Sequence, residues 1–435
     1  MKEPAFDDAL ADGPSLSQLA EPVTEPPVDT LSLRSIPRIA IQAFCESDAV
    51  IGVIEGVGAD RRMAKTHVKV HKGGIAAAIE FYRNAPTPNL IMIESRLAPA
   101  KLLEGLEDLA EVCDAGTKVI IIGHVNDVPL YRELIHRGIS DYLVAPIDLF
   151  QVIRTIGDLY TDPDAEPLGR TLAFVGAKGG AGASTVAHNV AWSIGRMYDS
   201  DVVLADLDLA FGTAGLDFNQ DPLQGVHEAV SSPDRLDETM LDRLLAKCAD
   251  RLSLLAAPAS LERTYDYGET SFDGLVDVMR QGAPSVVLDM PHGWTNWMRK
   301  LLASSDDVIL VAEPDLANLR NAKNLADTLR QLRPNDPAPK LVLNRVGVPK
   351  RPEIKTAEFA DALGLEAIAI IPFEPQLFGT AANNGQMIGE QDARHTTAAL
   401  FEQIAQAATG RGEARRDKGL AIGSLVTRIL KRASK

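Results

Sequence analysis

Short apolar runs alternate with amphipathic stretches of helical length along the first third of the chain after residue 38. Strand candidates at 39–43, 68–70, 90–93, 119–122 and 142–144 alternate with helix candidates near 47–58, 74–83, 98–113, 128–137 and 149–159. A strand followed by a helix, repeated five times, is typical of a doubly wound α/β domain with a parallel sheet. The pattern predicts such a domain over residues 37–160.

A polar, proline-containing segment at 161–170 interrupts this alternation and is predicted to be a linker. The alternation then resumes, with helical stretches between most of its apolar runs. Seven strand candidates follow, at 171–175, 201–206, 252–257, 284–289, 307–312, 340–344 and 366–371. They predict a second doubly wound α/β domain over residues 171–410.

Both ends of the chain depart from this pattern. Residues 1–36 contain several prolines and acids but few apolar residues, so we expect a disordered acidic tail. Residues 411–435 are basic, and their apolar residues recur at helical spacing from Ile422 to Ala433. This amphipathic tail favours membrane contact through 419–435, although docking on a protein surface would need the same periodicity.

The charge and composition of the chain argue against several classes of protein. The 435 residues carry a net charge of −16, which disfavours a broad grip on nucleic acid. Three cysteines lie far apart, as expected in a reducing compartment, and no apolar run of transmembrane length is present. The acidic start lacks the apolar region of a signal peptide, so we expect a cytoplasmic protein.

Two segments of the first domain, 88–94 and 138–147, resemble strands of response-regulator receiver domains. Phosphoryl transfer in that family needs an aspartate nucleophile, an acidic pair for Mg²⁺ and a lysine. Other residues occupy the corresponding positions here, namely Glu94, Phe44, Cys45, His124 and Ala145. We therefore expect an atypical receiver-like domain that serves docking, with Glu94 either a solvated strand-end acid or a mimic of phosphoaspartate.

A glycine-rich loop joins the first strand and helix of the second domain. Residues 174–186 read Phe-Val-Gly-Ala-Lys-Gly-Gly-Ala-Gly-Ala-Ser-Thr-Val. Such a loop presents backbone N–H groups and a helix N-terminus to a phosphate. A P-loop lysine normally precedes the Ser/Thr pair, but that position is Ala183, while Lys178 stands five residues earlier. The predicted nucleotide contacts are Lys178, Gly179, Gly180, Ala181, Gly182, Ala183, Ser184 and Thr185.

The position of Lys178 in this loop resembles the deviant Walker A motif of MinD/ParA-type ATPases. The resemblance implies that Lys178 reaches a partner subunit's nucleotide and that Asp208 positions the attacking water. It also implies Mg²⁺ held by Ser184 and Asp289. The remaining implied nucleotide contacts are Gly293 near the γ-phosphate, Asn344 at the adenine edge and Pro372 in the segment beside the base.

The receiver-like domain, the altered loop and an Asn-Asn-Gly-Gln motif at 383–386 together resemble the CpaE/TadZ family. The resemblance implies a homodimeric, ATP- and Mg²⁺-binding localisation factor that contacts pilus and secretion machinery of tight-adherence type IV (Flp/Tad) pili. It would act at the cytoplasmic face of the inner membrane, at a cell pole. Loss of one charged phosphate contact, about 1.5–3 kcal/mol, predicts retained ATP binding with weak or absent hydrolysis. A nucleotide-independent scaffold and a ParA-like DNA-partitioning ATPase are the alternatives.

Overall fold

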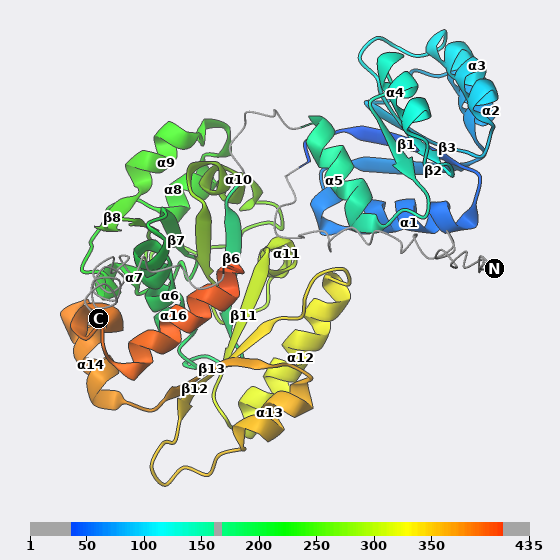
Figure 1. The fold of residues 1–435 in the computed structure, drawn as a ribbon. Helices are drawn as coiled ribbons and strands as arrows, with labels where there is room; N and C mark the ends of the chain where they lie inside the picture. Colours follow the sequence, from blue (N-terminus) through cyan, green and yellow to red (C-terminus); the bar gives the residue numbers. More distant parts are fainter. Residues whose placement is uncertain (1–35, 161–167, 412–435) are drawn as a thin grey trace, which may run out of the picture.

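The chain folds into two α/β domains, each built on its own sheet, in a computed structural model that describes residues 36–160 and 168–411 (Figure 1). The predicted membrane-binding segment 419–435 lies outside the described residues, as do residues 1–35 of the predicted acidic tail and 161–167 of the predicted linker. Ile36, the last residue assigned to that tail, is 1% exposed and packs in the core of the first domain.

The first domain has a five-stranded parallel sheet in the order β2-β1-β3-β4-β5, which is the flavodoxin-like order. Its strands are β1 (Ala40–Cys45), β2 (His67–Lys72), β3 (Leu90–Ser95), β4 (Lys118–Gly123) and β5 (Asp141–Val144). Its helices are α1 (Asp48–Ala59), η3 (Arg61–Met63), α2 (Ile75–Tyr82), α3 (Pro99–Ala110), α4 (Val128–His136) and α5 (Leu149–Tyr160). The predicted fold class is confirmed for this domain.

Helices cover both faces of this sheet because successive strand residues point to opposite sides. On one face, apolar residues of α1 and α5 pack against Ile41, Ala43 and Met92. On the other face, α2, α3 and α4 pack against Ile91 and Ile93. The strands are therefore buried on both sides, which explains their nearly continuous apolar runs.

The second domain has an eight-stranded sheet in the order β13-β12-β11-β6-β10-β7-β9-β8, and its predicted α/β fold class is also confirmed. Its strands are β6 (Arg170–Gly176), β7 (Val202–Asp206), β8 (Ala246–Ala249), β9 (Leu252–Leu255), β10 (Ser285–Asp289), β11 (Asp307–Ala312), β12 (Lys340–Val346) and β13 (Ala367–Pro372). All neighbours pair in parallel except β8 with β9. The edge strand β8 was not predicted from the sequence pattern, because it has only four residues, three of them partly buried and one exposed.

The helices of the second domain also form two layers around the sheet. The face that carries α6 (Ala183–Tyr198) and α16 (Thr396–Thr409) is continued by α14 (Pro375–Asn384) and α15 (Ile388–Gln391). The other face is covered by α8 (Val226–Ser231), α9 (Glu238–Leu244), α10 (Asp273–Gly282), α11 (Asn296–Ser304), α12 (Leu316–Leu332) and α13 (Thr356–Leu363). The short helices α7 (Ala214–Asp217) and η4 (Pro233–Arg235) complete the domain.

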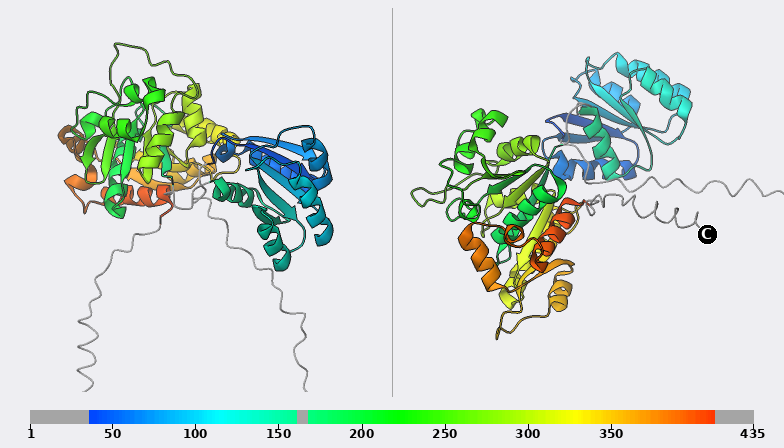
Figure 2. Two further views of the ribbon diagram at one scale, coloured as in Figure 1. Left: turned by 90° about the horizontal axis from the view of Figure 1, so that it is seen from above. Right: turned by 60° about the vertical axis from the view of Figure 1, so that its left-hand side comes forward.

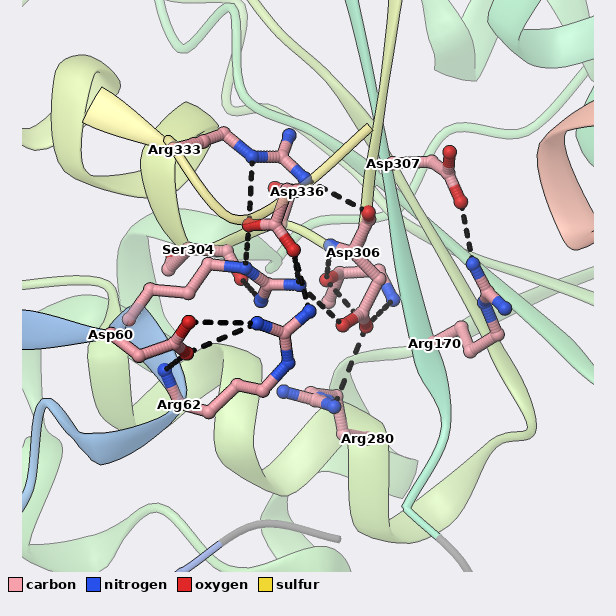
Figure 3. A network of polar contacts seen from close by, with 12 residues as sticks. Asp60, Arg62, Arg170, Arg280, Ser304, Asp306, Asp307, Arg333 and Asp336 are labelled. Carbon is pink, nitrogen blue, oxygen red and sulfur yellow. Dashed lines mark hydrogen bonds and ion pairs between the residues drawn. The ribbon is translucent and has the colours of Figure 1, made fainter. Parts of the chain in front are cut away.

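The two domains lie side by side and meet through a cluster of charged residues (Figures 2 and 3). From the first domain, Arg61 donates to the carbonyl of Ser304 and to the carboxylates of Asp306 and Asp336. Arg62 also reaches Asp336, and Asn335 donates to Asp60 in return. Because Asp306 and Asp336 precede β11 and β12, the first domain contacts the amino-terminal edge of the large parallel sheet.

Candidate functional site

The glycine-rich loop leaves β6 at the carboxyl-terminal edge of the sheet and ends at the first turn of α6. Gly180 and Gly182 have φ values of +84° and +89°, which favour glycine. A Cβ on Gly182 would lie 2.3 Å from Nδ2 of Asn344. That same Nδ2 donates to the carbonyl of Ala181 at 2.8 Å. Asn344, predicted to contact the base, therefore also fixes the loop against β12.

Ala183 begins α6, and its methyl group packs against the apolar core instead of supplying a cation to the loop. Ser184 and Thr185 follow on the first helical turn and are partly buried. Lys178, Gly179 and Gly180 are exposed on the loop. Lys178 is thus the lysine of this loop, and its side chain is exposed.

Two aspartates stand next to each other where β7 and β10 end. Asp206 and Asp289 are register partners on these neighbouring strands, and both are buried. The carboxylate of Asp206 accepts the N–H groups of Asp208 and Ala214, both at 3.1 Å. Burial and the charge of Asp289 raise the pKa of Asp206 to about 7. Asp208, partly buried nearby, has a raised pKa for the same two reasons.

His188 of α6 connects Asp289 to a second carboxylate. Its Nε2 lies 3.1 Å from Oδ2 of Asp289, and its Nδ1 lies 2.7 Å from Oδ2 of Asp217. Burial alone would lower the pKa of His188, but the two carboxylates outweigh it and raise the pKa to about 10. The two carboxylates therefore favour the protonated form of the ring. Neither His188 nor Asp217 was predicted from the sequence, although a histidine inside an apolar helical stretch was a usable signal.

The second oxygen of Asp289, Oδ1, is buried and has no hydrogen-bond partner among the described residues. A buried oxygen without a partner is unfavourable unless a ligand satisfies it. A carboxylate oxygen suits Mg²⁺, and so does the hydroxyl of Ser184. No cluster of three or more His, Cys, Asp or Glu side chains in residues 36–160 and 168–411 could hold a metal by itself. A metal held by Ser184 and Asp289 would take its remaining ligands from phosphate and water.

A cavity of about 350 Å³ lies beside the loop. It brings together four residues that the sequence predicted to contact nucleotide: Gly182, Thr185, Asn344 and Pro372. Its wall is completed by Val186, Asn189, Asp217, Arg345, Phe373, Glu374, Pro375, Phe378, Gly379, Ala381, Ala382, Gln386, Met387 and Ile388. Apolar and aromatic side chains with a few polar groups are what a nucleoside cavity needs.

Gly293 does not line this cavity. It lies in a separate hollow of about 270 Å³ with Gly176, Ala177, His292 and Trp294. A Cβ on Gly179 would come within 3.4 Å of the His292 ring, so this segment lies against the glycine-rich loop. The segment that carries Gly293 is therefore a neighbour of the glycine-rich loop, although Gly293 and Gly182 line different cavities.

In the first domain, Glu94 has no exposed surface, so its interpretation as a solvated strand-end acid is wrong. Oε2 accepts the N–H groups of Glu46 and Ser47, and Oε1 contacts Ser47 Oγ and His124. Burial would raise the pKa of Glu94, but these hydrogen bonds outweigh it and hold the pKa below its ordinary value. Glu94 thus fixes the loop that precedes α1.

Comparisons with known proteins fit both domains. The pilus assembly protein CpaE from Caulobacter crescentus is 48% identical over 98% of its solved chain and 30% of this chain, with a TM-score of 0.29. A ParA family ATPase from Chlorobium tepidum shares the fold, with 22% identity over 54% of this chain and 98% of its own, and a TM-score of 0.50.

The septum site-determining protein MinD of Synechocystis is 25% identical over 276 residues, which are 61% of this chain and 98% of that protein. No family model matches the chain. The likeness to CpaE rests on sequence identity over nearly the whole of that solved chain. The chain belongs to the CpaE family of pilus assembly proteins, with a receiver-like domain followed by a P-loop domain of the MinD/ParA class.

Proposed function

We propose that this protein binds ATP with Mg²⁺ at the carboxyl-terminal edge of its second sheet. Occupancy of the site would control a homodimer that helps to place and assemble a tight-adherence type IV (Flp/Tad) pilus. The observation that carries the nucleotide proposal is the cavity shared by Gly182, Thr185, Asn344 and Pro372, together with Oδ1 of Asp289, which has no partner among the described residues.

Each part of the nucleotide has a candidate partner. The base would occupy the cavity between Asn344 and Pro372, and the phosphates would contact the N–H groups from Gly179 to Thr185. Ser184 and Asp289 would hold Mg²⁺, which neutralises phosphate charge when it is bound. The choice of ATP among nucleotides follows from the MinD/ParA class of the domain, and the cavity beside the loop is consistent with it.

Hydrolysis is proposed to be weak or absent. Ala183 places no cation where charge develops on the phosphates during transfer. Asp208 is proposed to position the attacking water, since it lies just beyond the end of β7, close to Asp289. Lys178, exposed on the loop, would supply the missing charge to a partner subunit, and this gives ATP a role in dimer formation.

The pilus role is inferred from the family, since CpaE of Caulobacter crescentus is a pilus assembly protein. Placement at the cytoplasmic face of the inner membrane, at a cell pole, is part of the same proposal. No described helix is long and apolar enough to cross a bilayer. Membrane contact is assigned to segment 419–435 because its sequence is both basic and amphipathic.

Calorimetric titration of the full chain with ATP, with and without Mg²⁺, tests the proposal. We expect saturable binding that Mg²⁺ strengthens, and turnover that rises in an Ala183→Lys variant. Sedimentation with ATP should show a dimer, which Lys178→Ala weakens. A wild-type protein that takes up no ATP would identify the second domain as a nucleotide-independent scaffold. ATP-dependent retention on duplex DNA by a chain ending at residue 411 would instead support a partitioning ATPase.

A further inference from the structure

The imidazole of His188 lies between two carboxylates that belong to different parts of the proposed nucleotide site. Asp217, on α7, lines the cavity proposed for the nucleoside. Asp289, at the end of β10, is the proposed Mg²⁺ residue. The ring has no exposed surface, and Phe218 lies beside it with ring centroids 5.6 Å apart. Its position is therefore fixed on every side.

The contact with His188 occupies one oxygen of Asp289 and leaves the other oxygen available to a ligand. Nε2 of His188 contacts Oδ2 at 3.1 Å, while Oδ1 is buried without a described partner. Asp206, on the adjacent strand, differs from Asp289 because each of its oxygens accepts a backbone N–H group. His188 alone among the described residues thus holds the Asp289 carboxylate by a side-chain hydrogen bond.

We propose that His188 is a positioning residue. Through Nε2 it keeps Oδ1 of Asp289 turned toward the metal, and through Nδ1 it ties that orientation to Asp217 in the cavity wall. The inference rests on the proposed function, because it assigns His188 to the Mg²⁺ end of the same ATP site. Partners that orient a metal ligand typically change metal affinity by about 10–100-fold when they are removed.

The test compares ATP affinity of the full chain in Mg²⁺ and in EDTA, measured by calorimetry. For His188→Leu we expect ATP affinity in Mg²⁺ to fall by about 10–100-fold, with affinity in EDTA within about twofold of wild type. His188→Gln keeps one donor and should recover part of the difference. Asp217→Asn, at a carboxylate that is 23% exposed, should lower the Mg²⁺-dependent affinity in the same direction without endangering the fold.

Ser193→Ala is the matched control. Ser193 is buried on the same helix and donates to the carbonyl of Asn189, away from Asp289. It should change the melting temperature but leave the ratio of affinities in Mg²⁺ and EDTA unchanged. The inference is overturned if the His188 and Asp217 variants lower ATP affinity by the same factor in Mg²⁺ and in EDTA, or if they lower it in neither buffer. His188 would then have only a structural role. If wild type binds no ATP in either buffer, the proposed function itself fails.

Discussion

The guanidinium of Arg61 crosses from the first domain to Asp336 of the second, with 2.6 Å between Nε and Oδ2. Their side chains are 13% and 3% exposed, so water screens the pair poorly. The hydrogen bond from Arg61 to the carbonyl of Ser304 adds a second attachment on the other domain. A single arginine thus links two elements that precede β11 and β12.

Replacing Arg61 should separate the domains. Removing one partner of a buried ion pair costs up to about 3–5 kcal/mol, and the cost here should be smaller because Asp336 keeps Arg62 and Arg333. We expect Arg61→Ala to increase the radius of gyration in small-angle scattering and to split thermal unfolding into two transitions. Lys65→Ala is the control, since its ion pair with Asp277 is largely exposed and contributes little. An unchanged scattering curve for Arg61→Ala would show that other contacts hold the domains together.

The same interface should be sensitive to acid. Burial favours the neutral form of Asp336, but Arg61, Arg62 and Arg333 outweigh it and hold its pKa below the ordinary value. The stability that Asp336 contributes through these arginines is therefore fully present above the pKa of about 3.9 that it has in the unfolded chain. It is lost as the pH falls through the lower folded value. Scattering between about pH 6 and pH 3 should show the domains separating only at the acid end, and Asp336→Asn should flatten this dependence.

Glu94 should contribute to stability and not to phosphorylation. In Glu94→Gln the charge that accepts from Glu46 and Ser47 is lost, and hydrogen bonds to charged groups contribute about 1.5–3 kcal/mol. We expect a drop of that size in the free energy of unfolding, measured with urea. Glu107→Gln removes an exposed partner of Arg137 and should change stability by no more than about 0.5 kcal/mol. Equal effects of the two substitutions would contradict this assignment.

Gly182→Ala should disrupt the loop and the cavity together. The positive φ of Gly182, and the 2.3 Å that would separate an added Cβ from Nδ2 of Asn344, leave no room for a methyl group. We expect calorimetric ATP binding to be lost and the protein to be destabilised by at least about 1 kcal/mol. Gly52→Ala, in the interior of α1 with open space around it, should instead stabilise by about 0.5–1 kcal/mol.

The basic C-terminal segment is predicted to bind membranes. Truncation before residue 419 should abolish sedimentation with vesicles that contain anionic lipid, because both the apolar face and the cations are removed. Neutral vesicles serve as the control and should retain less of the full chain. Equal sedimentation of the truncated and full chains would assign the segment to a protein contact.

The sequence predicted both sheets because buried parallel strands produce apolar runs that are visible without any knowledge of the fold. It also predicted that Asp206 and Asp289 end their strands and that Asn344 lies on a strand, because each follows an apolar run. The sequence did not predict His188 as a site residue, because its role depends on Asp217 and Asp289, which are far away in the chain. The burial of Glu94 was not predicted for the same reason, since Ser47 and His124 contact it only after folding.

The helix α11 begins just after Gly293 and Trp294, beside the glycine-rich loop, and ends at Ser304, whose carbonyl accepts the Arg61 hydrogen bond. A hydrogen-bonded helix resists stretching, so its two ends keep a fixed separation. The first domain is therefore attached to the far end of a rigid rod whose near end stands at the proposed γ-phosphate position. A shift of that near end along the helix axis would also move the carbonyl of Ser304 to which Arg61 is bound.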